Sequence, residues 1–331
     1  MIDTLRFEFS GVVPAQGRRG CKLSERTSSQ WNKDDTEHPV VNSPNFTLTD
    51  ETTGARFLGW VNPDSEEERY LVRTVELSVP RLIYGHNFRE IPRADFGKAL
   101  ERTMRYCHEV APPEAFIQEL CPMGSGSWDL KRVDLVKQFR ASSSDLIAAH
   151  RASRHPAMRS GGCEWFGESI AWKGKERMLR MYDKLQEAGK LREPSNVTRL
   201  ELETKGRAME RDLGPRVNRL PVLTFDACYS AYRAQVMRLQ PTSLPAAEGW
   251  IEFLAMLQRY GVTVQGVPVF EVWMRGKGKS TIRRVRAQIA AVRPSYWSWN
   301  WAEVLPEDPA AVVIVEPTAE EIERYSAASA A

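Results

Sequence analysis

The stretch from Cys163 to Asp183 reads CEWFGESIAWKGKERMLRMYD, and its pattern indicates the fold. Two runs rich in apolar and aromatic residues, 163–172 and 176–182, are separated by Lys173, Gly174 and Lys175. A short connection that contains glycine, placed between two strand-like runs, is typical of a β-hairpin. An antiparallel sheet is therefore predicted around this segment.

Other segments alternate apolar and polar residues and predict more strands. In Thr4 to Ser10 every second residue is large and apolar, a period of two that buries one face of a strand. The strand at 197–203 is expected to place Leu200 and Leu202 on one face and Arg199, Glu201 and Glu203 on the other. Further extended segments are predicted at residues 70–83 and 131–136.

Helical spacing of apolar residues predicts the remaining elements. In residues 92–110 the apolar side chains recur every three or four positions. Helices are likewise predicted at 143–154, 183–189, 208–213, 224–239 and 246–260, and residues 14–44 are expected to form a long loop. The fold class is α+β, with a central antiparallel sheet, packed helices and a mainly helical C-terminal portion. A catalytic domain is expected at 1–220 and a basic, DNA-contacting portion at 221–331.

Composition excludes several classes of protein. The chain has 331 residues, of which 42% are hydrophobic and 27% charged, so collagen-like, disordered and disulfide-scaffold proteins are not indicated. Its five cysteines and five histidines show neither CxxC nor HExxH spacing, so zinc is not signalled. No apolar run is long enough for a membrane span and the start has no signal-like core, so we expect a cytoplasmic protein.

Acidic residues at or near predicted strands are candidate metal ligands. Asp134, Asp183 and Glu201 offer carboxylate oxygens, which Mg²⁺ or Mn²⁺ prefers. The alternative is structural, because Arg132 shares a strand face with Asp134, and Arg199 with Glu201, so these residues could form ion pairs instead.

Tyr182 is the candidate nucleophile. It ends a predicted strand and is followed by Asp183 and Lys184. A phenol has a pKa near 10, so attack on phosphorus requires a neighbouring cation and a metal to stabilise the phenolate. The alternative is an interfacial tyrosine with its hydroxyl in water.

Two further groups are candidate DNA contacts. His86 and Asn87 follow an extended segment, where they either contact phosphate or hold a loop. Near the C-terminus a stretch without acidic residues precedes a cluster of aromatics, a combination used to bind nucleic acid. A solvated helix face beside a tryptophan-lined core is the alternative. The residues concerned are Arg275, Lys277, Lys279, Arg283, Arg284, Arg286, Trp297 and Trp299.

Taken together and in order, these motifs resemble the gene II protein family, the replication initiators of filamentous bacteriophages. The resemblance covers about the first 235 residues and depends on the shared order of several short motifs. The matching stretches are 1–5 (MIDTL), 80–87 (PRLIYGHN), 132–134 (RVD), Trp172, 179–187 (LRMYDKLQE), 198–201 (TRLE) and 223–227 (LTFDA).

The resemblance implies a rolling-circle nicking and joining enzyme. Such an enzyme cuts one strand of supercoiled phage DNA at the origin, keeps a 5′-phosphotyrosine link, leaves a 3′-hydroxyl primer and later rejoins the displaced strand. The family's Tyr, Lys and Glu pattern falls on Tyr182, Lys184 and Glu187, and its acidic positions on Asp134 and Glu201. The resemblance also implies a host helicase and a replicative polymerase as partners.

Two alternatives remain open. One is a phage regulator that binds DNA without cutting it, which would need the basic stretch but not the tyrosine and its acidic neighbours. The other is a plasmid or integrated-element initiator with the same chemistry. Paired histidines, which hold the metal in the larger superfamily of rolling-circle nucleases, are absent from the sequence, so carboxylate ligation of Mg²⁺ or Mn²⁺ is the expectation.

Overall fold

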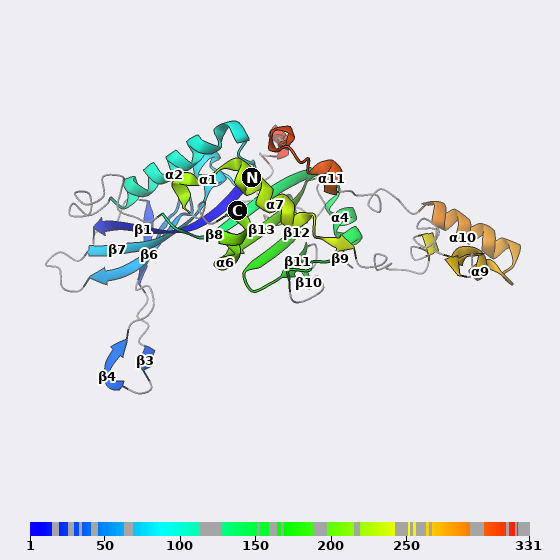
Figure 1. Cartoon of the computed structure of the whole chain (residues 1–331), viewed down its shortest axis with the longest axis horizontal. Helices are drawn as coiled ribbons and strands as arrows, with labels where there is room; N and C mark the ends of the chain where they lie inside the picture. Colours follow the sequence, from blue (N-terminus) through cyan, green and yellow to red (C-terminus); the bar gives the residue numbers. More distant parts are fainter. Residues whose placement is uncertain are drawn as a thin grey trace. The chain divides into compact units, whose positions relative to one another are not determined.

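The computed structural model confirms the α+β class, with an antiparallel sheet and packed helices (Figure 1). The structure describes residues 1–14, 20–25, 30–32, 35–40, 46–62, 69–112, 128–150, 153–158, 164–166, 169–187, 197–214, 219–241, 251, 254–255, 263–264, 267–291, 301–315, 318–321 and 323. Within them, no helix is both long and apolar enough to cross a membrane.

The described strands include a ten-stranded sheet with the order β10-β11-β12-β13-β8-β1-β7-β6-β5-β2. All strand pairs with a defined register are antiparallel. In the part of the chain that the structure describes, three further sheets of two strands each are formed by β3 and β4, by β9 and β14, and by β15 and β16. The described strands of all four sheets are Ile2–Pro14 (β1), Cys21–Glu25 (β2), Gln30–Asn32 (β3), Asp35–Val40 (β4), Phe46–Asp50 (β5), Arg56–Asn62 (β6), Arg69–Ser78 (β7), Leu130–Arg140 (β8), Ser153–Arg154 (β9), Glu164–Phe166 (β10), Ser169–Lys173 (β11), Arg177–Asp183 (β12), Val197–Lys205 (β13), Gln240–Pro241 (β14), Thr263–Val264 (β15) and Val267–Pro268 (β16).

Helices occupy much of the remaining described chain. The α-helices are Val79–Tyr84 (α1), Phe96–Val110 (α2), Ser143–His150 (α4), Lys184–Glu187 (α5), Arg207–Leu213 (α6), Phe225–Val236 (α7), Val269–Met274 (α9), Lys279–Ala291 (α10) and Trp301–Val304 (α11). Short 3₁₀ helices lie at Arg93–Asp95 (η1), Leu220–Val222 (η2) and Pro309–Ala311 (η4).

The chain divides into two compact units. The first unit contains Met1–Gln138, Glu201–Arg233 and Glu307–Ala331, and the second contains Phe139–Leu200 and Ala234–Pro306. The predicted domain boundary between residues 220 and 221 falls inside the segment Glu201–Arg233 of the first unit. Division of the chain into a catalytic domain and a C-terminal DNA-contacting portion stays a prediction.

In the first unit, β1 pairs with β7 on one side and β8 on the other. Its alternating residues Leu5, Phe7 and Phe9 are buried, as the sequence pattern predicts. The register of β6 and β7 shifts at Gly59, where a Cβ atom would overlap the carbonyl oxygen of Leu71. Glycine is needed at this bulge because two backbones approach closely there.

Several segments differ from the sequence-based expectation. The helix predicted at 143–154 ends at His150, and Ser153–Arg154 forms β9. The described part of residues 14–44 contains β2, β3 and β4, so it is not a long loop throughout. The extended segment predicted at 70–83 ends at Ser78, and α1 follows it. Ser78 caps α1 by accepting a hydrogen bond from the Arg81 backbone N–H (3.4 Å), and Gly85 at φ +79° ends the helix.

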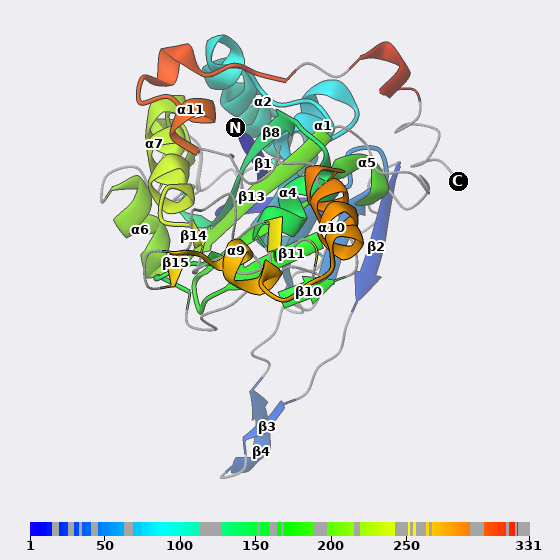
Figure 2. The ribbon, with the colours of Figure 1, turned by 90° about the vertical axis from the view of Figure 1, so that its right-hand side faces the viewer.

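Helices α1 and α2 lie along one face of β1 and β7 (Figures 1 and 2). The buried residues of α2 include Phe96, Leu100 and Cys107, which confirms the predicted spacing of three or four. Phe96 meets Phe225 of α7 edge-on, with ring centroids 5.7 Å apart. Helix α2 is thus held in the first unit by its apolar stripe.

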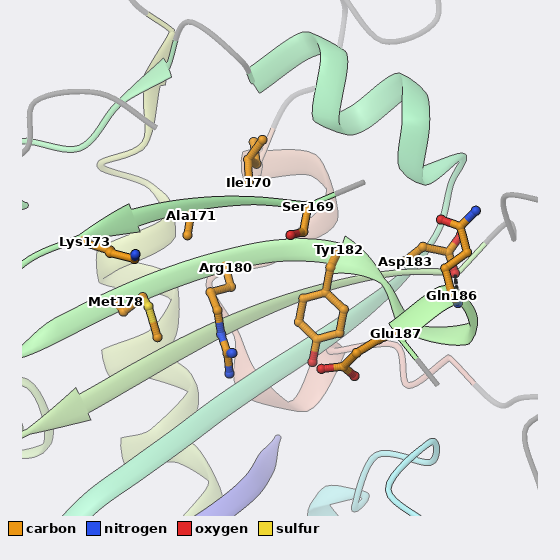
Figure 3. A pocket seen from close by; sticks show the side chains of 10 residues that line it. All are labelled: Ser169, Ile170, Ala171, Lys173, Met178, Arg180, Tyr182, Asp183, Gln186 and Glu187. Atoms are coloured by element: carbon orange, nitrogen blue, oxygen red, sulfur yellow. Dashed lines mark hydrogen bonds between the residues drawn. The ribbon is translucent and has the colours of Figure 1, made fainter. Parts of the chain in front are cut away.

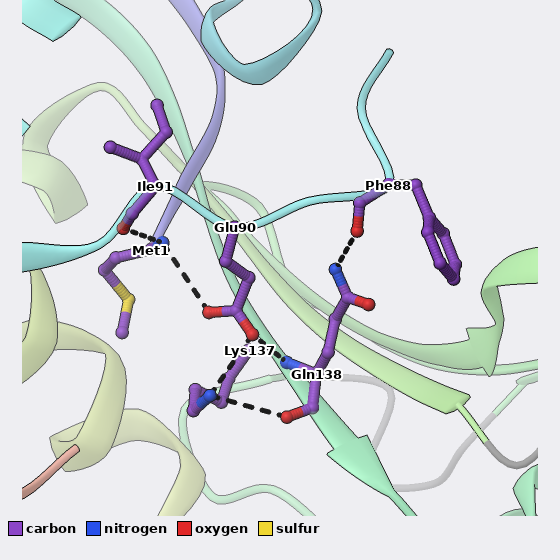
Figure 4. Close-up of polar contacts among 6 residues, drawn as sticks. All are labelled: Met1, Phe88, Glu90, Ile91, Lys137 and Gln138. Atoms are coloured by element: carbon purple, nitrogen blue, oxygen red, sulfur yellow. Dashed lines mark hydrogen bonds and ion pairs between the residues drawn. The ribbon is translucent and has the colours of Figure 1, made fainter. Parts of the chain in front are cut away.

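A buried polar network around Glu90 joins the chain after α1 to β8 in the first unit (Figure 4). The Glu90 carboxylate accepts hydrogen bonds from the Lys137 ammonium (3.2 Å) and the Gln138 backbone N–H (2.7 Å). The Met1 amine lies 3.7 Å from the other carboxylate oxygen. The Gln138 side chain donates to the Phe88 carbonyl. Because Glu90 and Lys137 are both buried, each charge depends on the other for compensation.

The Glu90→Ala variant should lose about 3–5 kcal/mol of unfolding free energy, because it leaves the Lys137 ammonium buried without its anion. Urea unfolding followed by circular dichroism measures this loss. Glu101→Ala, on the exposed side of α2, is the matched control and should change stability by less than about 0.5 kcal/mol. Equal effects of the two substitutions would contradict the role of the buried pair.

Candidate active site

The predicted hairpin is confirmed as β11 and β12 of the second unit, and it separates a buried face from a cavity face. Its first predicted strand, residues 163–172, is instead divided into β10 and β11, which pair with each other. In its register Tyr182 lies opposite Ser169, and Arg180 opposite Ala171. The Gly174 backbone N–H donates to the Arg177 carbonyl oxygen (2.8 Å) and closes the turn. Successive side chains on a strand point to opposite faces, so the residues next to Tyr182 point away from it.

One face of the hairpin is packed into the core. Ile170, Trp172, Leu179 and Met181 are fully buried. The other face forms much of the wall of a cavity of about 530 Å³. The residues that line the cavity are Ser169, Ile170, Ala171, Lys173, Met178, Arg180, Tyr182, Asp183, Gln186 and Glu187. The side chain of Ile170 points to the opposite side of the hairpin in Figure 3.

Tyr182 lies in this cavity with charged groups around its ring. Figure 3 shows its hydroxyl directed toward the carboxylate of Glu187, with Arg180 beside it on the same strand face. The Lys184 ammonium lies 5.7 Å from the centre of the Tyr182 ring and 2.6 Å from Glu187 Oε2. The structure thus brings together the three residues of the predicted Tyr, Lys and Glu pattern.

Asp183 has a structural role in the same unit. Its Oδ2 accepts a hydrogen bond from the Ser143 hydroxyl of α4 (2.6 Å), and its Oδ1 accepts one from the Gln186 backbone N–H (3.0 Å). The second bond caps the start of α5, so it orients the turn that carries Lys184 and Glu187. Both carboxylate oxygens are therefore used to position the site, and metal ligation by Asp183 stays a prediction.

Helix α4 supports the hairpin from its core side. Its His150 ring lies 6.5 Å from the Trp172 ring of β11 and 5.3 Å from the Trp301 ring. His150 Nδ1 lies 2.8 Å from the Leu146 carbonyl oxygen. Burial lowers the pKa of His150 to about 4, because the charged imidazolium is poorly solvated there.

Carboxylates also gather in the first unit, on β8 and on the part of β13 that belongs to it. Asp134, Glu201 and Glu203 are all buried. Arg132 binds Asp134 in bidentate fashion, with Nε to Oδ1 at 2.8 Å and Nη2 to Oδ2 at 2.5 Å, and lies 3.4 Å from Glu203. Both faces of β13 are buried, because Val197 to Thr204 are all buried.

This cluster has unusual electrostatics. Burial raises the pKa of Asp134 to about 7, and the charges of Glu201 and Glu203 act in the same direction. The hydrogen bonds from Arg132 oppose that shift, and Asp134 in turn raises the pKa of the Arg132 guanidinium. Asp134 therefore does form the ion pair with Arg132 that the structural alternative predicted. The Asp134 carboxylate in this pair is buried and not at the surface.

Two of the three predicted metal ligands share this cluster. Among the described residues, no group of three or more His, Cys, Asp or Glu side chains is arranged to hold a metal ion. Asp134 and Glu201 still offer hard oxygen donors, and Mg²⁺ commonly takes only one or two carboxylates from protein. The donor chemistry of the pair therefore fits Mg²⁺. Because Tyr182 belongs to the second unit, its predicted meeting with Asp134 and Glu201 stays a prediction.

The predicted DNA contacts lie in several places. His86 Nδ1 accepts a hydrogen bond from the Phe88 backbone N–H (3.2 Å), which favours the loop-holding role, and Asn87 is half-buried beside it. Trp297 and Trp299 lie outside the described residues. The six basic residues are exposed on the turn after α9 and on α10, and their contact with DNA stays a prediction. They are Arg275, Lys277, Lys279, Arg283, Arg284 and Arg286.

Arg180 and Lys173 line the cavity but were not among the predicted site residues. Arg180 precedes Tyr182 by two positions and therefore shares its strand face, a relation that the strand period makes predictable. Lys173 comes from the opposite strand, across from Met178, and only the hairpin register places it on that face. It also pairs with Glu164 of β10. Both cations suit a phosphate group in the cavity.

Neither a protein-family model nor a curated protein matches this chain. Among solved structures, the chain is similar to the rolling circle replication initiator protein from Geobacillus stearothermophilus. The sequence identity is 13% and the TM-score 0.29, over 62% of this chain and 73% of the other. Similarity of this size does not establish a common fold or function.

His150 makes the second unit sensitive to acid. Its pKa is lower in the folded chain than in the unfolded chain, so the unfolded state binds more protons between about pH 6.5 and 4. Its contribution to stability is present above pH 6.5 and falls as the pH drops toward 4, by about 3 kcal/mol in total. His150→Phe should flatten this part of the stability profile, measured by urea unfolding at pH 4–8. An unchanged slope in the variant would contradict it.

Proposed function

We propose that this chain nicks and rejoins one strand of DNA through Tyr182, as a rolling-circle replication initiator. The observation that carries the proposal is a tyrosine hydroxyl in a cavity of about 530 Å³ that Arg180 and Lys173 also line. A phenol in a core without a cavity would have no access to substrate. The phage origin as target, and the host helicase and polymerase as partners, come from the resemblance to the gene II family.

In the proposed reaction the Tyr182 oxygen attacks the phosphorus of a phosphodiester. The new P–O bond joins tyrosine to the 5′ side of the cut, the bond from phosphorus to the 3′ oxygen breaks, and that oxygen takes up a proton to become a hydroxyl. Attack by a free 3′-hydroxyl reverses these steps and rejoins a strand. The phosphodiester bond energy is conserved, so no nucleotide cofactor is required.

Each charged neighbour of Tyr182 has a role in this reaction. Glu187, toward which the hydroxyl is directed in Figure 3, is the proposed proton acceptor. The Lys184 ammonium stabilises the phenolate that forms, and its ion pair with Glu187 keeps the two side chains together. Arg180 and Lys173 bind the nonbridging phosphate oxygens.

Asp134 and Glu201 are the proposed ligands of Mg²⁺ or Mn²⁺. Such an ion, when bound, supplies positive charge to phosphate oxygens. Release of Asp134 from its bidentate contact with Arg132 would make both of its oxygens available.

The second candidate function is a regulator that binds DNA without cutting it. The exposed basic residues of α10 favour DNA binding and are independent of Tyr182. The two functions differ in whether a covalent adduct forms.

With supercoiled origin DNA and Mg²⁺, the wild-type chain should give nicked circles that carry a detergent-resistant protein adduct. Tyr182→Phe should abolish both products, because it removes the attacking oxygen and little else. Agarose gels and denaturing gels with labelled DNA measure the two products.

The matched control is Tyr229→Phe, a tyrosine buried on α7 of the first unit. It should keep nicking and adduct formation within a few fold of wild type. Full nicking by Tyr182→Phe would remove this nucleophile and leave the non-cutting regulator as the better proposal.

Asp134→Asn and Glu201→Gln should each reduce nicking by at least about 100-fold while DNA affinity changes less than about threefold. Each substitution removes a negative charge that Mg²⁺ needs but keeps the shape of the side chain. Nicking assays, fluorescence anisotropy with labelled DNA and calorimetric titration with Mn²⁺ measure the effects. Wild-type nicking in both variants, or unchanged Mn²⁺ binding, would assign these carboxylates to the ion-pair network alone.

A further inference from the structure

Helices α9 and α10 lie side by side and are joined by the turn Arg275–Gly278 (Figures 1 and 2). Gly276 has φ +77°, a conformation that glycine adopts without strain. Backbone hydrogen bonds close the turn, from Lys277 N–H to the Met274 carbonyl (3.2 Å) and from Ile282 N–H to the Gly278 carbonyl (3.1 Å). A helix, a short turn with glycine and a second helix is the connectivity of helix-turn-helix DNA-binding motifs.

The two helices share a small apolar core. Met274 of α9 and Val285 of α10 are buried together with Leu254, and Ile282 and Ile289 pack against them. Ile282, Val285 and Ile289 are spaced at three and four residues, so they form one stripe along α10. The apolar face of α10 is therefore already used for packing.

The remaining surface of this helix pair is strongly basic. From Val267 to Ala291 the sequence contains six Lys or Arg residues and one acid, Glu271. All six cations are exposed. Lys277 covers the ring of Trp273, with its ammonium 5.5 Å from the ring centre. A surface of this charge attracts a polyanion.

The chemistry of the surface favours one kind of polyanion. A membrane-binding helix inserts its apolar face into lipid, but that face of α10 packs on its own core. Single-stranded DNA is bound by stacking on aromatic side chains, and α10 contains none. The major groove of double-stranded RNA is too narrow and deep for side chains to read. Duplex DNA remains, because its major groove is about 12 Å wide and admits a helix about 10–12 Å across.

We propose that the α9–α10 helix pair is a duplex-binding module, with α10 lying in the major groove of DNA. This goes beyond strand cleavage and holds whether or not Tyr182 is a nucleophile. A helix of 13 residues is about 20 Å long, enough to follow about six base pairs.

The helical period divides the basic residues of α10 into two sets. Arg283 and Arg284 point away from the apolar stripe, at about 100° per residue, and are placed for base edges at the floor of the groove. Lys279 and Arg286 lie at the flank of the stripe and are placed for phosphates at the groove wall. Arginine pairs with guanine, so Arg283 and Arg284 give the module side chains for sequence preference.

The test uses the full chain with Tyr182→Phe, so that binding is measured without the proposed cutting. Fluorescence anisotropy compares a labelled 24-base-pair duplex with its single strand at about 100 mM salt. When Arg283→Ala and Arg286→Ala are added together to this parent chain, its affinity for the duplex should fall at least about tenfold. The affinity should also depend less on salt concentration. Arg286→Lys alone should keep the salt dependence, because it keeps the phosphate-binding charge.

The matched control replaces Arg102 and Arg105, which are exposed on α2, by alanine and removes the same charge. It should leave duplex binding within about threefold of the parent chain. Thermal unfolding checks that all variants are folded. Equal duplex affinity of the α10 variant and its parent would overturn the proposal, as would an equal loss for the single strand. Loss of nicking by Tyr182→Phe tests the proposed function separately.

Discussion

The antiparallel pairing of β11 with β12 is the constraint on which the candidate site depends. Because side chains alternate along a strand, the residues that bury Trp172 and Met181 in the core also force Tyr182 and Arg180 to the opposite face. A shift of the register by one residue would exchange the two sets. The core side thereby determines which groups line the cavity, and Asp183, held by Ser143, determines where the strand ends and α5 begins.

Buried charge is used in two different ways in the first unit. Around Glu90 the ions are paired within short distances, and the network joins two segments far apart in the sequence. Around Asp134 the Arg132 guanidinium contacts two buried carboxylates, Asp134 and Glu203, and Lys205 also lies beside Glu203. Burial and the charges of Glu201 and Glu203 raise the pKa of Asp134, and an added cation would relieve this repulsion, so we propose this cluster rather than the Glu90 network as the metal site.

The helix pair α9–α10 shows how apolar packing can select a ligand. Its apolar stripe is occupied by Met274 and Leu254, so only the charged side of α10 is available to a partner. Exposed positive charge on α10, a helix without aromatic residues, favours a regular, deep groove over flexible single strands. The two proposals thus place DNA binding and strand cleavage on different elements of the chain.

The sequence by itself determined the local elements. The turn Lys173–Lys175, the alternation of β1 and the helical spacing of α2 are visible without coordinates, because they reflect periods of 2.0 and 3.6 residues in the backbone. The order of short motifs also predicts Tyr182, Lys184 and Glu187 as site residues. Only the tertiary structure decided the environment of these side chains. Lys173 reaches the cavity through cross-strand register, Asp183 caps a helix, and both faces of β13 are buried. These outcomes depend on contacts between residues distant along the chain, about which a local pattern carries no information.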